Sequence, residues 1–485
     1  MKPDNKLFNL LRTFTARDFR LFNDFLNSPY FNKQQVLIEF FHHLKKYHPH
    51  YEHDEFDKQK LFKMFFPEQK FDDKKLRYLT TDLTRLAEKY LSIENLQHDD
   101  FALSNHLLHE HTKRENVEEF GRHFNVLKLN ERNAKIKDGD FFLHHFLNEF
   151  RYINFAYPRQ SRKQQSNMER VLEHLDKFYL HRKLQLLCEV VNVKSLLAKD
   201  YKVFMQQELI AQLQKHPYSE TPVIQIYLVI YKTLTENENE KHFEKLSILL
   251  KQFEEQVSKT ELFEMYQYLM NYCIRKINSG KQEYLKKLFE IYKTILANKV
   301  IMQNDVLSQW DFKNITTIAL RLKEFAWTKK FIDEYQNHLP KGEQNNAVIY
   351  NTANLHFQKA EFSKALKLLR DVEFTDLVYQ LDTRSMLLKI YFETDDEEAL
   401  HYHATAFKTF LKRNKLVSKT HQLIYNNLIR YTEKLMKYQG NKKLLHVLKT
   451  EIENNSNIAD AQWLKFQVGQ ISNLSLVIGE DANHG

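Results

Sequence analysis

Glycine and proline are scarce in this 485-residue chain, which contains eight of each. Each makes up about 1.6% of the residues, whereas roughly 7% glycine and 5% proline are usual in soluble proteins. Tight hairpin turns and β-bulges depend on glycine, so a sheet-rich protein of this length needs many more of them. Long helices joined by short polar loops need few. The composition therefore predicts an all-α protein.

Cysteines and long apolar runs are also rare. Cys188 and Cys273 are the two cysteines and stand far apart, as small buried side chains do in a reducing compartment. The first residues, MKPDNKLFNLLRTF, contain no apolar core of a secretory signal. The most apolar run, 223–231, is too short to cross a bilayer. We therefore expect a cytoplasmic protein without membrane association.

Common catalytic motifs are missing as well. The two closest glycines are Gly479 and Gly485, so neither a P-loop nor a dinucleotide-binding fingerprint can form. The chain has no Gly-x-Ser-x-Gly elbow, no His-Glu-x-x-His helix and no Cys-x-x-Cys pair. We expect a protein without cofactor or catalytic activity. An enzyme of unrecognised type stays open as an alternative.

Histidines are numerous, but their spacing does not indicate a metal site. His106, His109 and His111 cluster around Glu110, and His106 shares a helical face with Glu110. This spacing fits no known zinc pattern, because His109 stands where an inverted protease motif needs glutamate. We therefore expect no bound metal.

The remaining prolines and glycines divide the chain into helical blocks. Two prolines within six residues, in the run HPYSETP, mark the clearest boundary, at residue 216. Beyond it we expect six helical hairpins in succession and a final capping helix. The predicted layout is an N-terminal helical domain over 1–98, a middle helical segment over 99–216, a helical-hairpin array over 217–475 and a flexible tail over 476–485.

Small residues recur within the array. The segment IYNTANLHFQKAEFSKALKLLRDV, 349–372, places Ala353 in a first helix, Ala360 at a turn and Ala365 in a second helix. This segment resembles a tetratricopeptide repeat, in which small residues allow two helices to cross closely. The 34-residue period of that family carries Ala365 to Ala399. The resemblance implies an α-α hairpin superhelix, that is, a solenoid similar to tetratricopeptide-repeat proteins.

The N-terminal part carries a second resemblance. The run FLNSPYFN, 25–32, is followed by LRYLTTDLTRLAEKYL, 76–91. Together they resemble uncharacterised bacterial proteins of similar length whose C-terminal parts are helical repeats. This resemblance supports the domain layout and implies no activity.

If the tetratricopeptide register is right, the first helix of each hairpin lines a concave face. The family members that bind chaperone tails have lysine where Tyr350 stands, and Asn354 alone matches, so we expect no carboxylate clamp. The mixed aromatic and polar groove instead indicates a scaffold that binds a peptide or helix of another protein. Alternatively, its aromatic residues are buried against the helix expected over 417–437. The residues expected to face the groove are Tyr350, Asn354, Phe357, Gln358, Arg384, Leu388 and Tyr391.

A basic stretch, 151–183, offers an alternative function. Arg159, Arg162 and Lys163 stand beside Tyr152 and other aromatic residues around a proline. Aromatic rings can stack on bases while the cations contact phosphates, so binding of RNA or single-stranded DNA is the alternative hypothesis. The simpler interpretation is that these basic residues cover the surface of a buried helix.

Overall fold

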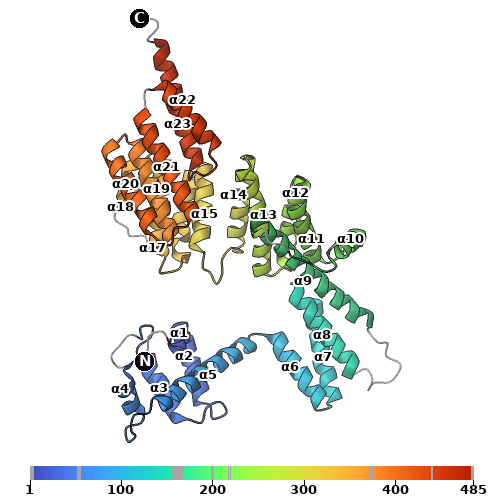
Figure 1. Cartoon of the computed structure of the whole chain (residues 1–485). Helices are drawn as coiled ribbons and strands as arrows, with labels where there is room; N and C mark the ends of the chain where they lie inside the picture. Colours follow the sequence, from blue (N-terminus) through green and yellow to red (C-terminus); the bar gives the residue numbers. More distant parts are fainter. Residues whose placement is uncertain are drawn as a thin grey trace. The chain divides into compact units, whose positions relative to one another are not determined.

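The computed structural model describes residues 5–51, 56–155, 168–197, 201–216, 218, 220–370, 376–438 and 441–481, with side chains left out over 195–197 and 472–481. Within these ranges the chain forms helices α1 to α23 and no β-strand (Figure 1). An isolated bridge joins Gln303 and Val306. The all-α prediction is confirmed.

The chain divides into two compact units, Met1–Arg182 and Lys183–Gly485. The division falls inside α9 (Met168–Leu197), whereas the sequence pattern placed boundaries after residues 98 and 216. Val190, Val191 and Val193 are weak helix formers, yet α9 runs through them without a break.

The first unit begins with five helices around an aromatic core. Phe22 lies at its centre, with ring centroids 5.0 Å from Phe41 and 5.3 Å from Tyr90. Thr15 and Asp18 form a capping box, which fixes the start of α2. The helices are α1 (Lys6–Arg12), α2 (Ala16–Asn27), α3 (Gln35–Lys45), α4 (Lys58–Phe65) and α5 (Asp73–Gln97).

The rest of the first unit has a much smaller core. Its helices are α6 (Asp100–Lys113), α7 (Val117–Asn133), α8 (Gly139–Phe155) and the first half of α9. Among the described residues, the apolar cluster between these helices contains five buried side chains, Leu108, Phe120, Phe124, Leu127 and Phe155. This part of the chain is therefore held together by few apolar contacts.

The second unit is a succession of contacting helices. From α11 onward each helix packs against the next, and α15, α17, α19, α21 and α23 also contact one another in that order. The helices are α10 (Gln206–Lys215), α11 (Pro222–Thr235), α12 (Glu240–Gln252), α13 (Lys259–Asn278), α14 (Glu283–Ala297), α15 (Gln309–Arg321), α16 (Phe325–Tyr335), α17 (Gln344–Gln358), α18 (Phe362–Arg370), α19 (Leu377–Glu393), α20 (Glu397–Arg413), α21 (Lys419–Tyr438), α22 (Lys442–Asn454) and α23 (Ala461–Asp481). Helix α23 extends into the predicted tail.

Three hairpins of this unit share one turn. Lys323, Ala360 and Asp395 each occupy the left-handed backbone region, with φ of 61°, 58° and 54°. In each turn the following amide donates back to the helix; Glu361 N, for example, lies 2.9 Å from the His356 carbonyl oxygen. The turns lie 37 and 35 residues apart along the chain, so the hairpins do not repeat at a fixed 34 residues.

This spacing decides which alanines occupy the helix crossings. Ala353 on α17 and Ala365 on α18 are fully buried, as the resemblance implies. Counted from the turn, the residue equivalent to Ala365 in the next hairpin is Leu400, which is 2% exposed. Ala399, one residue earlier, is only partly covered. The one extra residue in this repeat moves the alanine off the crossing.

We expect Ala365→Leu to lower the free energy of unfolding by roughly 1–3 kcal/mol, because the α17–α18 contact has no room for a larger side chain. Urea unfolding of the full chain measures this. The matched control is Ala406→Leu, at an exposed position on α20, which should change stability by less than about 0.5 kcal/mol. Equal effects of the two variants would show that Ala365 does not occupy a tight crossing.

Candidate functional site

A groove of about 900 Å³ opens in the second unit, along α15, α17 and α19. The start of α23 and the residue before it form its other wall. The side chains that face it are Lys313, Asn314, Thr317 and Arg321 from α15, Tyr350, Asn354, Phe357 and Gln358 from α17, Asp382, Met386, Lys389 and Glu393 from α19, and Asp460, Gln462, Trp463, Phe466 and Gln467 from the α23 side.

The structure separates the seven residues that the sequence placed in a groove. All four on α17 line it, namely Tyr350, Asn354, Phe357 and Gln358. The three on α19 lie elsewhere, since Leu388 is fully buried and Tyr391 packs on the same apolar cluster, which includes residues of α21. The guanidinium of Arg384 lies 4.2 Å from the Phe410 ring centroid. The α17 residues of this set therefore line the groove, whereas those on α19 do not.

Tyr350 forms the floor of the groove rather than an accessible contact. It is 6% exposed, and its ring centroid lies 5.1 Å from that of Tyr379. The ammonium of Lys313 lies 5.4 Å from both ring centroids. Burial, together with the negative charges of Asp382 and Asp460, raises the pKa of the Tyr350 hydroxyl well above its ordinary value. Tyr350 therefore stays neutral and supports the site.

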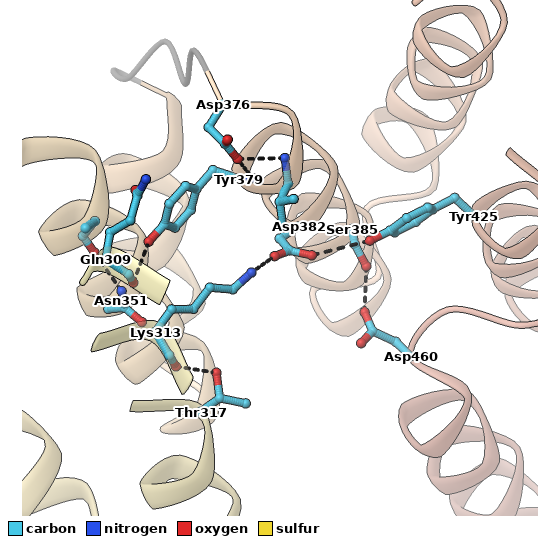
Figure 2. A network of polar contacts seen from close by, with 12 residues as sticks. Gln309, Lys313, Thr317, Asn351, Asp376, Tyr379, Asp382, Ser385, Tyr425 and Asp460 are labelled. Atoms are coloured by element: carbon cyan, nitrogen blue, oxygen red, sulfur yellow. Dashed lines mark hydrogen bonds and ion pairs between the residues drawn. The ribbon is translucent and has the colours of Figure 1, made fainter. Parts of the chain in front are cut away.

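The charged residues of the groove are largely paired with one another (Figure 2). Lys313 forms an ion pair with Asp382, which also accepts a hydrogen bond of 3.3 Å from the Tyr425 hydroxyl. Asp460 accepts hydrogen bonds from the Ser385 hydroxyl at 2.6 Å and from the Lys389 ammonium at 2.7 Å. These contacts join α15 to α19 and α19 to the residue that precedes α23.

The wall formed by α23 is the part that sequence reasoning missed. The Trp463 indole donates to Glu393 Oε1 at 2.9 Å, and the Gln467 amide donates to the same oxygen. Phe466 stands beside them and is 59% exposed. These residues lie about 70 positions from α19 in sequence, and the one signal was the expected capping helix after the array.

Amide and aromatic side chains are what this groove offers to a ligand. Asn314 and Gln358 are exposed, as is the Phe466 ring. Side-chain amides carry both donors and an acceptor, which match the peptide groups of an extended chain. Aromatic rings add apolar contact area with little loss of side-chain entropy. These side chains can form both hydrogen bonds and apolar contacts with a ligand.

The predicted nucleic-acid residues Arg159, Arg162 and Lys163 lie outside the described residues. Other cations of the basic stretch contact protein groups. Arg151 donates to the Asn105 carbonyl at 2.8 Å, Arg170 lies 2.6 Å from Glu131, and Arg182 pairs with Asp140. These contacts reduce the positive charge that this stretch can present to phosphates.

Arg170 belongs to a buried ionic cluster between α7, α8 and α9. Its guanidinium and the rings of His145 and His174 all approach the carboxylate of Glu131. Burial acts to raise the pKa of Glu131, but the His174 hydrogen bond and the nearby cations lower it to about 2. Burial lowers the pKa of His145 to about 4. In the described part of the chain, no group of three or more ligand-type side chains could hold a metal ion.

Comparisons with known proteins add no name to this site. No protein-family model matches the chain, and neither the curated proteins nor the solved structures contain a match. Among the described helices none is both long and apolar enough to cross a membrane. The function is therefore argued from the geometry of the groove.

The Lys313–Asp382 pair provides a test of the groove's floor. The two side chains are 16% and 22% exposed, so Asp382→Asn leaves a largely covered ammonium without its carboxylate. We expect Asp382→Asn to lower the free energy of unfolding by roughly 1–3 kcal/mol, measured by urea titration. The double variant Lys313→Met/Asp382→Leu, which removes both charges, should recover this stability. Glu433→Gln, which breaks the more exposed pair with Lys408, should lose less than about 1 kcal/mol. A loss from Glu433→Gln as large as that from Asp382→Asn would contradict this account.

The ionic cluster predicts acid sensitivity in the first unit. The native state keeps His145 neutral at pH values where the unfolded chain binds a proton, so stability falls as the pH drops from about 6.5 towards 4. We expect the free energy of unfolding to fall by roughly 1–3 kcal/mol across this window. Hydrogen exchange of α7 and α8 in urea measures this loss. His145→Gln should flatten this dependence, whereas His109→Gln, at an exposed position, should leave it unchanged. An unchanged slope in His145→Gln would rule out this origin.

Proposed function

We propose that this protein is a non-enzymatic scaffold that binds a segment of another protein in the groove along α15, α17 and α19. The observation that carries the proposal is the composition of the groove's surface. Its main cations and carboxylates pair with each other, while exposed amides and the Phe466 ring remain available. A surface of this kind forms hydrogen bonds to a peptide backbone and apolar contacts to its side chains.

A solenoid similar to tetratricopeptide-repeat proteins is part of this proposal. Three hairpins with the same left-handed turn support it, as do the contacts between alternate helices from α15 to α23. The buried Ala353 and Ala365 support the close crossing of α17 and α18. In such an array the first helices of successive hairpins form one continuous face, which is where the groove lies.

The proposed scaffold acts in the cytoplasm, without a cofactor. Its sequence has no common catalytic motif, and both cysteines are buried with the pKa of their thiols raised by burial. A thiol held in its protonated form is a poor nucleophile, which suits a structural role for both residues.

A groove variant paired with a surface control tests the proposal. Gln358→Ala with Phe466→Asp alters two exposed groove positions, while Tyr402→Asp alters α20 at a side chain that is 79% exposed and outside the groove. Affinity capture from native lysate, read by quantitative mass spectrometry, should recover a protein with the wild type and the control. We expect the groove variant to recover at least about tenfold less of this partner protein.

Thermal unfolding of all three proteins checks that the substitutions leave the fold intact. A partner that the groove variant retains at the wild-type level would place the binding site elsewhere. Loss from the Tyr402→Asp control as well would show that the effect is not specific to the groove.

A further inference from the structure

Helix α9 carries a row of exposed apolar side chains. Met168, Leu172, Leu175 and Tyr179 are 51%, 59%, 38% and 43% exposed. Leu186, further along the same helix, is 63% exposed. Single apolar side chains on a surface are ordinary, but a continuous row along one helix is typical of a face that pairs with a partner.

The opposite side of α9 is already buried. His174, Leu180 and His181 are less than 9% exposed and face the rest of the protein. The exposed row is thus a second apolar face on the same helix, so packing within the described chain does not explain it.

The spacing of the exposed row fits helix pairing. Its members follow one another at intervals of four, three and four residues, and Leu186 stands one heptad after Tyr179, with Arg182, which pairs with Asp140 of α8, between them. This is the heptad spacing by which two helices interlock their side chains. The series of intervals reads the same in both directions, so the row can pack against an antiparallel copy of itself.

Charges beside the row favour the same arrangement. Glu169 and Lys183 lie on one flank of the row, two heptads apart. When two such helices run antiparallel, Leu175 packs opposite Tyr179 of the other copy, and this register places each Glu169 opposite Lys183 of the other copy. Asp176 then faces its own counterpart at the centre, which limits the affinity.

We propose that α9 is a self-association surface through which two copies of this chain pair antiparallel. The paired region spans fewer than three heptads, and its centre carries two like charges. A dimer with a dissociation constant of about 10–100 µM is therefore expected. This inference does not depend on the groove of the second unit.

Sedimentation equilibrium of the full chain over about 1–200 µM tests the association. We expect a reversible dimer in the wild type, and Leu172→Glu with Leu175→Glu should weaken it by more than about tenfold. Leu444→Glu with Val447→Glu is the matched control, since it places the same charges on exposed apolar positions of α22. A wild type that stays monomeric throughout, or a dimer that survives the α9 variant, overturns the proposal.

A charge exchange tests the orientation. Glu169→Lys should weaken the dimer, because it places lysine opposite Lys183 of the second copy, and the further change Lys183→Glu should restore it. Asp176→Asn should tighten the dimer by removing the central repulsion. In a parallel pair, residues 169 and 183 of the two copies lie two heptads apart. Failure of the double exchange to restore association would therefore exclude the antiparallel arrangement.

Discussion

The carboxylates of Asp382 and Asp460 hold together the helices on which the groove depends. Lys313 reaches Asp382 from α15, while Lys389 and Ser385 of α19 reach Asp460 in the segment before α23. These polar contacts fix helices that are distant in sequence to one another. A pair of this kind is worth little when it is exposed, but partial burial strengthens it and makes the loss of one partner expensive. Geometry rather than net charge therefore defines this site.

Local chemistry explains why the helices themselves could be predicted from sequence. Capping side chains, a first-turn proline and apolar periodicity account for α2 at Ala16–Asn27 and α11 at Pro222–Thr235. The segment after α2 was harder. Asn32 precedes the next helix, as a capping residue does, but its side-chain amide donates to the carbonyls of Leu26 and Gln34. An asparagine can satisfy either set of backbone groups, and only the surrounding fold decides between them.

The same limit applies to the groove. Its α17 side could be inferred because Ala353 and the turn at Ala360 fix the register of one hairpin. A shift by a constant 34 residues then fails, because a non-glycine residue takes the left-handed turn in the hairpins α15–α16, α17–α18 and α19–α20, and its residue type does not mark the position. The turn residues Lys323, Ala360 and Asp395 are of three different types. The place of Trp463 and its neighbours in the groove could not be predicted, since no local sequence pattern links them to Glu393.

Helix α9 shows how pairing inside a protein changes the meaning of a charged stretch. In sequence, its lysines and arginines suggested contact with phosphates. In the structure Arg170, on the face opposite the apolar row, contacts Glu131, so this charge serves to fix α9 to α7, where the apolar core is small. Because this ionic contact anchors α9, the exposed apolar row on its opposite face is not needed for packing within the chain. A helix anchored by charge on one face and apolar on the other is suited to protein association, because the hydrophobic effect then acts between chains rather than within one.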